Sequence, residues 1–500
     1  METDQNVRKC LKQRLILLLF LLLQHCMFNP IVREILNLDP NNAKDDILNT
    51  LLLLAFVTDR SIPTATITPS TGNIILSNST IHVVFSKTMD PSTLSATLGS
   101  SLSSTWSHTK VLNDTVSLSG NLPVGKITFR LDAKDTFGQS ITQINGTYLV
   151  LNSNTSIYYV STLGNDSNSG NLSSAPKQSI QSAISGAIPP AAIFIAVGEY
   201  SVDSAVPTSI NLVDKVSLYG GYSLDFLSRN PNIYVSKIQD VSTGAVVDTR
   251  TIRAGATITR STVIDGLSIV GSSNLNASGN SFAVHCLNGS PTISNNLIQA
   301  GSVSSITTIG IMADASSPVI SDNTIFGGRS TTEYTFGIFL QNGASSEIQN
   351  NTIDAGIATN NSAHGIYTGP QANNPTIVGN IIYGGSGNIS FGLNTSHPSN
   401  ITLTSNSIDG GIGNTSYAIY HGTGGGNVGS YQSNSLYTSG GTNRYCLFEA
   451  GTGSSPLIFN QNRIYNCPTA IYFDQGSVAI NSISTINGGT TNGSSYSGNY

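Results

Sequence analysis

A short motif, Asn-x-Ile or Asn-x-Leu, recurs at intervals of 26 to 29 residues through the second half of the chain. Small or polar residues follow each copy, and short apolar segments such as Gly310-Ile-Met lie between the copies. The asparagines of the motif are Asn296, Asn323, Asn351, Asn380, Asn406, Asn434 and Asn462. Repeats of this length without helical periodicity predict stacked coils, because each coil is too small to bury an apolar face alone.

Leucine-rich repeats and β-solenoids both have coils of about this length. A leucine-rich repeat needs a Leu-x-x-Leu-x-Leu framework, which these segments lack. They contain Ser-Pro-x-Ile-x-x-Asn-x-Ile instead, as at Ser317 to Ile325. Side chains alternate along a strand, so Asn323 points inward together with Ile325. Inward amides stacked about 4.8 Å apart can hydrogen-bond to one another, so the repeat predicts an Asn ladder inside a β-solenoid.

Four segments before the repeats carry a family resemblance. They are Ile157 to Gly170, Pro176 to Ile184, Ile193 to Tyr200 and Val216 to Tyr222. Together they resemble the opening of bacterial right-handed parallel β-helix proteins, and they are similar to the family called domain of unknown function 1565. The resemblance covers roughly residues 157–500 and implies an all-β, pectin-lyase-like right-handed parallel β-helix. It implies no particular chemistry, because this fold carries enzymes, adhesins and proteins without known activity.

The composition is that of an exported β-rich protein. Only 10% of the residues are charged, and the chain contains 49 Gly and one Trp. No lysine follows Lys237, so the second half of the chain has few positive charges. Nucleic acids and anionic membranes need a basic surface, so we expect neither as a partner.

The N-terminus predicts export. Positive residues from Arg8 to Arg14 precede the apolar segment from Leu15 to Leu23, which is too short to span a bilayer. Residues 1–25 are therefore predicted to be a signal peptide. Leu23-Gln-His-Cys26 resembles a bacterial lipobox, with Cys26 as the lipidated residue, although His25 stands where most lipoboxes have a small residue. The alternative is a signal peptide that is cleaved nearby without lipidation. Lipidation would place the protein in the cell envelope, at the outer membrane or the cell surface.

Two further segments precede the β-helix. Residues 26–61 predict a partly helical tether, whose apolar run from Ile47 to Val57 is again too short for a membrane span. Residues 62–150 contain alternating strands separated by turn residues, with a single central Trp106, and they look like a bacterial Ig-like β-sandwich. Such modules act as spacers, so we expect residues 151–156 to be a hinge.

The cysteines leave one question open. Cys446 and Cys467 lie on neighbouring coils, which allows a disulfide, but their offsets from Leu447 and Ile471 differ. The chain contains none of the common metal or phosphate-binding motifs, so we expect no metal and no cofactor.

One outward column contains candidate catalytic residues. In the third position after each ladder asparagine, which should face outward, stand Gln299, Phe326, Asp354, Tyr383, Asp409, Tyr437 and Tyr465. Asp354 and Asp409 should lie two coils apart, at about 9.6 Å, which is near the upper limit for the carboxylate pair of an inverting glycosidase. The alternative is that they are solvated surface acids. A pectate-lyase mechanism has less support, because it needs clustered calcium-binding acids and a basic residue.

A second outward column is rich in aromatic residues. Each of its residues directly follows an inward aliphatic residue, and these inward residues run from Val284 and Ile311 to Ile471. The candidate ligand contacts in this column are Phe339, Tyr367, Tyr420, Phe448 and Tyr472. Met312 and Asn394 occupy the same column. An exposed line of rings can stack against sugars, whereas covered rings would be structural.

These patterns favour an exported, lipid-anchored envelope protein whose β-helix binds a glycan or an envelope or host protein without catalysis. The alternative is a carbohydrate-active enzyme, a polysaccharide hydrolase or lyase, on the same fold. A cavity with acids on adjacent coils would favour the enzyme, and a smooth aromatic face would favour binding.

Overall fold

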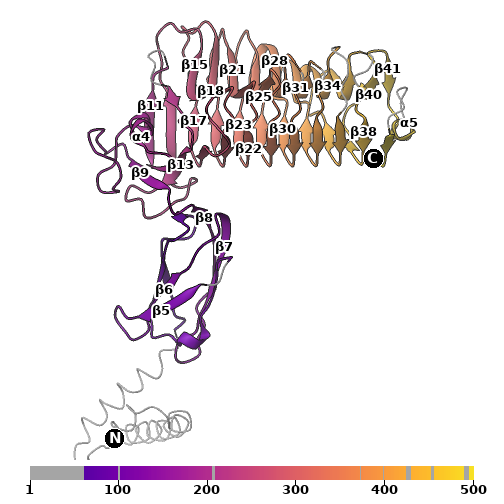
Figure 1. Cartoon of the computed structure of the whole chain (residues 1–500). Coiled ribbons are helices and arrows are strands. Elements are labelled where there is room, and N and C mark those ends of the chain that lie inside the picture. Colours follow the sequence, from indigo (N-terminus) through magenta and orange to yellow (C-terminus); the bar gives the residue numbers. More distant parts are fainter. Residues whose placement is uncertain are drawn as a thin grey trace, which may run out of the picture.

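The computed structural model describes residues 61–500 except 100–101, 205–208, 372, 398, 424–428, 452–454 and 489–494. The described chain forms a small N-terminal module, indigo in Figure 1, and a long stack of coils that runs from magenta to yellow. The predicted signal peptide, Cys26 and nearly all of the predicted tether lie outside the described residues. Within residues 61–500, as far as they are described, no helix has the length and hydropathy needed to cross a membrane.

The N-terminal module consists of two four-stranded sheets that face each other across one apolar core. The first sheet is antiparallel and has the order β1 (Ala65–Thr68), β3 (Ile81–Phe85), β6 (Thr115–Ser119), β5 (Ser103–Ser107). The second has the order β2 (Ile74–Leu76), β8 (Ile144–Leu151), β7 (Gly125–Asp132), β4 (Ser95–Thr97), and only β2 and β8 are parallel. A short 3-10 helix, η1 (Pro91–Thr93), precedes β4. This arrangement fits the expected Ig-like part.

The sequence predicted a central position for Trp106 in the sandwich, and this prediction is wrong. Its ring lies on the edge strand β5, half buried, with its centroid 5.9 Å from that of Phe85. Phe129 and Tyr148, from the central strands of the other sheet, fill the middle of the core and are almost fully buried. An edge strand has a neighbour on one side only, so its side chains cannot be enclosed as completely as those of a central strand.

The coils form a parallel β-helix with three sheets, and each regular coil contributes one strand to each sheet. The first sheet contains β9 (Ser156–Val160), β10 (Ala191–Ala196), β13 (Val216–Tyr222), β16 (Val263–Asp265), β19 (Thr292–Ser294), β22 (Val319–Ser321), β26 (Glu347–Gln349), β29 (Thr376–Val378), β32 (Thr402–Thr404), β35 (Ser430–Gln432), β38 (Ile458–Asn460) and β42 (Ser495–Ser497). The second sheet contains β11 (Gly198–Val202), β14 (Ser236–Asp240), β17 (Ser268–Val270), β20 (Leu297–Gln299), β23 (Thr324–Phe326), β27 (Thr352–Asp354), β30 (Ile381–Tyr383), β33 (Ser407–Asp409), β36 (Ser435–Tyr437) and β39 (Arg463–Ile464).

The third sheet has the longest strands. It contains β12 (Ile210–Asn211), β15 (Thr249–Ala254), β18 (Asn280–Leu287), β21 (Thr307–Asp314), β25 (Thr335–Gln341), β28 (Ile357–Thr368), β31 (Ser386–Thr395), β34 (Ile412–His421), β37 (Asn443–Glu449), β40 (Ala470–Asp474) and β41 (Val478–Ile480), with β24 (Arg329–Ser330) paired to β28. The strand β41 is antiparallel to β40. Two short helices, α4 (Ile180–Gly186) and α5 (Ile483–Asn487), lie in the first and last coils (Figure 1).

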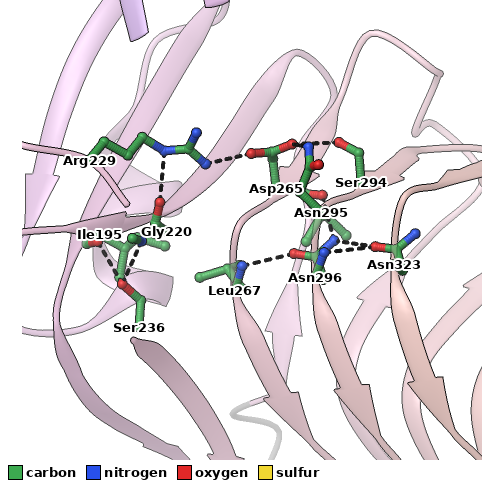
Figure 2. Close-up of polar contacts among 12 residues, drawn as sticks. Ile195, Gly220, Arg229, Ser236, Asp265, Leu267, Ser294, Asn295, Asn296 and Asn323 are labelled. Atoms are coloured by element: carbon green, nitrogen blue, oxygen red, sulfur yellow. Dashed lines mark hydrogen bonds and ion pairs between the residues drawn. The ribbon is translucent and has the colours of Figure 1, made fainter. Parts of the chain in front are cut away.

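The interior is a column of aliphatic side chains with the Asn ladder at one corner. Asn351 donates from its backbone N and its Nδ2 to Oδ1 of Asn380, at 2.8 and 3.0 Å, and its Nδ2 also reaches the carbonyl oxygen of Ile320. The same bonds recur along the stack from Asn296 (Figure 2). They continue past Asn462 to Asn499, which the sequence pattern missed because 37 residues separate the two.

The N-terminal module is in contact with the first coils. Ile74 of the module belongs to one buried cluster with Phe194 and Tyr222 of the first sheet. The Nδ2 of Asn73 donates to the carbonyl oxygen of Leu227, at 3.0 Å. The spacer role of the module stays a prediction, but the expected hinge at residues 151–156 is flanked by packed residues.

The structure forms the disulfide that the sequence left open. Cys446 and Cys467 are bonded, with their Cα atoms 5.6 Å apart, and they tie together the last coils of the stack. The unequal offsets that argued against this bridge have a structural cause. Cys446 lies within β37, whereas Cys467 lies in the turn between β39 and β40, so the bond joins a strand of one coil to a turn of the next.

Candidate functional site

The outward column of the second sheet forms what we call the mixed face, because aromatic rings and carboxylates alternate along it. Strand pairing places Phe326 beside Asp354, Asp354 beside Tyr383, and Tyr383 beside Asp409 on successive coils. This is the order that the sequence predicted. The two carboxylates line one open cavity of about 350 Å³, together with Tyr383, Ser439 and the flanking Ile357 and Ile412.

The two carboxyl groups of the mixed face have different surroundings. Asp354 is half buried, and this desolvation raises its pKa, as does the nearby negative charge of Asp409. Asp409 is only 4% exposed. It accepts hydrogen bonds from the backbone N of Gly411, at 2.9 Å, from the backbone N of Ser439, at 2.8 Å, and from the Ser439 hydroxyl. These donors stabilise a negative charge on Asp409. The expectation that both acids are solvated surface residues is therefore wrong for Asp409.

The rings of the mixed face are open to solvent. Phe326 and Tyr383 are each 37% exposed, and none of the ring contacts among the described residues involves either of them. Further along the column, Tyr437 and Tyr465 stack on each other at 5.0 Å. The flat faces of Phe326 and Tyr383 are therefore free of other rings and can contact a sugar ring.

The third sheet carries a different outward surface, the stacked face, which consists of two columns of rings. The first column was missed by the sequence analysis and contains Phe282, Ile309, Phe336, His364, Phe391, Tyr417 and Tyr445. Its rings lie almost parallel at short distances, for example 4.7 Å from His364 to Phe391 and 5.1 Å from Phe391 to Tyr417. A signal for it existed in the sequence, since a ring precedes the predicted column by three residues in Phe336-Gly-Ile-Phe339 and Tyr417-Ala-Ile-Tyr420.

The second column of the stacked face contains four of the five predicted ligand contacts. Phe339, Tyr367, Tyr420 and Phe448 are all half buried. Tyr420 stacks on Phe448 at 5.4 Å, and Phe339 meets Tyr367 edge to face at 4.8 Å. Neighbouring rings therefore cover much of the surface with which these side chains would stack on a sugar. The ligand-contact hypothesis for them stays a prediction, and the geometry favours the alternative that they are structural.

The prediction for the fifth residue, Tyr472, is wrong. Tyr472 pairs with Leu447, points into the β-helix and is 0% exposed, while Phe473 takes the outward position beside Phe448. The shift by one residue in the last coil reverses the two faces of the strand. Ile471, which was expected inside, is half buried.

Inside the last coils, Tyr472 takes part in a buried polar cluster. Its hydroxyl donates to Oε1 of Glu449, at 2.5 Å, and the Ser455 hydroxyl donates to Oε2 of the same carboxyl, at 3.0 Å. Burial raises the pKa of Glu449 to about 7.

Asn394 was also expected to face solvent, but it is 7% exposed and hydrogen-bonds the ring of His364 at 3.2 Å.

The described residues contain no group of three or more His, Cys, Asp or Glu side chains that could hold a metal ion. Burial lowers the pKa of His364 and of His421 to about 3, and the pKa of His285 to about 4. His285 and His364, which lie on the stacked face, are therefore neutral near pH 7, and this surface carries no charge at either position.

Comparison with known proteins bears out the family resemblance. Residues 162–401 match the family described as "Protein of unknown function (DUF1565)". No curated protein matches the chain.

Three solved structures are similar in fold. "The complex structure of XylC with xylose" has 12% sequence identity and a TM-score of 0.31, over 57% of this chain and 69% of that one. ORF18 of Geobacillus virus E2 has 11% identity and a TM-score of 0.31, over 54% of this chain and 53% of that one. The family 28 exopolygalacturonase of Yersinia enterocolitica has 12% identity and a TM-score of 0.28, over 88% of this chain and 96% of that one.

Proposed function

We propose that this protein is an exported, lipid-anchored envelope protein whose β-helix binds glycan chains on the mixed face. The observation that carries this proposal is the cavity lined by Asp354, Asp409 and the exposed ring of Tyr383, with the exposed ring of Phe326 beside Asp354 on the preceding coil. Free ring faces supply contact with the apolar faces of sugars, and the carboxylates accept hydrogen bonds from sugar hydroxyls. These rings and carboxylates are sufficient for binding a glycan without catalysis.

The export part of the proposal rests on the N-terminal sequence and the disulfide. Bonds such as Cys446–Cys467 persist in oxidising compartments outside the cytosol. The anchor is tested by growing cells with a fatty-acid analogue and measuring its incorporation into the full chain. Cys26→Ser should abolish labelling, and labelling that persists in this variant contradicts the lipid anchor.

Glycan binding is tested on an array of neutral and acidic glycans. Tyr383→Ala should lose at least ten-fold in affinity for the bound glycan, because contact rings act as binding hot spots. The matched control is Tyr334→Ala, which removes a tyrosine that is 41% exposed beside the stacked face. Equal binding by the two variants would place the glycan elsewhere.

A second candidate function, polysaccharide hydrolysis with inversion, is favoured by the contrast between the two carboxyl groups. Inverting glycosidases use a carboxylic acid with a raised pKa and a carboxylate base about 6.5 to 9.5 Å apart. Asp354 would protonate the glycosidic oxygen, and Asp409 would take a proton from the water that attacks the anomeric carbon from the opposite side. Two strand spacings of about 4.8 Å place the residues roughly 9.6 Å apart, at the upper limit of this range.

The two functions are separated by the release of reducing ends from the glycan that binds. If hydrolysis occurs, Asp354→Asn and Asp409→Asn should each reduce the rate by at least 100-fold while binding persists. Asp314→Asn on the third sheet is the control and should leave the rate unchanged. The absence of any release by the unaltered protein, with binding intact, would leave binding as the function.

A further inference from the structure

A groove separates the N-terminal module from one part of the β-helix. Its volume is about 820 Å³, within the range of small-molecule sites, which are frequent between domains. The module supplies one wall, including Val124, Lys126 and Thr147, and the first coils supply the other. This groove is distinct from the cavity of the mixed face, which lies several coils further along the stack.

A fixed polar network forms the β-helix side of the groove. Asp265 accepts from Nη2 of Arg229, at 2.5 Å, from the Ser294 hydroxyl, at 2.7 Å, and from Nδ2 of Asn295, at 2.6 Å (Figure 2). The Arg229 and Asp265 side chains are only 9% and 6% exposed. Their charges are therefore held in place before any ligand arrives.

The stacking of the coils does not require this network. The positions that pair with Asp265 along the first sheet are Ser294, Ser321, Gln349 and Val378. Burying an ion pair is costly, and apolar or small polar residues stack equally well here. Along this column the carboxylate stands on one of the coils that line the groove, and a loop residue, Arg229, supplies its partner. This placement associates the ion pair with the groove.

The lining of the groove indicates the chemistry of its ligand. Two cationic residues, Lys126 and Arg229, oppose two anionic residues, Asp265 and Asp322, so a charged ligand gains no net attraction. Hydroxyl and amide groups of Ser294 and Asn295 offer donors and acceptors. Apolar side chains are also available, because Val124 is 56% and Leu297 is 46% exposed. A sugar ring presents the same mixture of hydroxyl groups and apolar faces.

We propose that this groove is a second binding site, for a neutral oligosaccharide, in which Asp265, Asn295 and Ser294 hold the sugar hydroxyls. The site is independent of the mixed face.

The proposal is tested by calorimetry on the full chain with cellohexaose, maltohexaose and chitohexaose, and with a galacturonate hexamer as the charged probe. Asn295→Gly removes the amide, and glycine accepts the φ of 54° at this position. The matched control is Asn350→Gly, at the same corner two coils further along, where φ is 55° and the residue does not line the groove. Thr147→Trp fills the groove from the exposed surface of the module.

We expect a neutral hexamer to bind the unaltered chain more tightly than the charged one. Asn295→Gly should then weaken its binding at least ten-fold, Thr147→Trp should abolish it, and Asn350→Gly should leave it unchanged. The proposal is overturned if no neutral hexamer binds, or if binding survives Asn295→Gly and Thr147→Trp. Binding that survives both but is lost in Tyr383→Ala would overturn the groove and support the mixed face. Binding that is lost in the groove variants and retained in Tyr383→Ala would support the groove as a separate site.

Discussion

The mixed face and the stacked face are two outward surfaces of the same β-helix, and both are rich in aromatic side chains. On the stacked face the rings lie against one another, so that Phe391 is only 6% exposed. On the mixed face a carboxylate stands between successive rings from Phe326 to Tyr437, and Phe326 and Tyr383 remain 37% exposed. Aromatic residues at coil spacing therefore form either a structural stack or a contact surface, depending on whether the neighbouring coil also presents a ring.

The largest expected difference between the faces is in stability. Phe391→Ala should lower the free energy of unfolding by about 3 to 5 kcal/mol, because it removes a buried ring from the middle of a stack. Tyr383→Ala on the mixed face should cost less than about 1 kcal/mol, since it lacks this packing. Urea unfolding followed by circular dichroism measures both. Similar losses would mean that the two faces do not differ in the way described.

A substitution in the interior should lower stability by an amount between the losses expected for the two faces. Asn351→Leu leaves the amides above and below it without their partners, so it should cost about 1 to 3 kcal/mol. The control is Asn360→Leu, an exposed asparagine of the adjoining third-sheet strand β28. An equal effect of the two substitutions, measured by the same urea unfolding, would show that the ladder adds nothing to stability.

The stacked face should also make the protein sensitive to acid. The folded-state pKa of His364 is about 3, below the usual value of 6.5, because burial disfavours the charged form. Its contribution to stability is complete above pH 6.5 and is lost as the pH falls toward 3. At pH 5 this loss is about 2 kcal/mol. His364→Phe keeps a ring in the stack but cannot be protonated. The free energy of unfolding should therefore fall by about 2 kcal/mol less between pH 7.5 and pH 5 in this variant than in the unaltered chain.

The mixed face should show a smaller pH dependence of opposite sign. The pKa of Asp354 is raised in the folded protein, so the unfolded chain releases this proton at a lower pH. The resulting contribution is present at low pH and is lost as the pH rises through the folded-state pKa. Asp354→Asn should flatten this part of the stability profile, with an effect below that of His364→Phe because Asp354 is partly solvated. An identical profile for the variant and the unaltered chain would contradict the raised pKa.

Much of the fold was predictable because every repeat shows the same alternation of inward and outward side chains. The inward positions of Asn323 and Ile325 follow from alternation along one strand, and each further coil repeats that pattern. The order of residues on the mixed face follows from the same counting. Prediction was wrong at Tyr472, where the coil length changes and one residue of register exchanges the inner and outer faces.

The candidate site was only partly predictable, because exposure depends on neighbours in space. Asp354 and Asp409 were identified from their column, but the shielding of Asp409 by Ser439, from the following coil, was not. The structural role of Phe339 and Tyr367 depends on Phe336, whose ring contacts both. The groove beside Asp265 exists only because the N-terminal module packs on the first coils.

The sequence by itself determined that the chain forms stacked coils with an Asn ladder inside, because periodic alternation specifies which side chains face inward. Only the tertiary structure decided which outward rings pack together and which stay open. It also decided that Cys446 reaches Cys467 and that Arg229 reaches Asp265. Strand periodicity assigns a side chain to a face, whereas its contacts depend on the stagger between coils and on segments that are distant in the sequence.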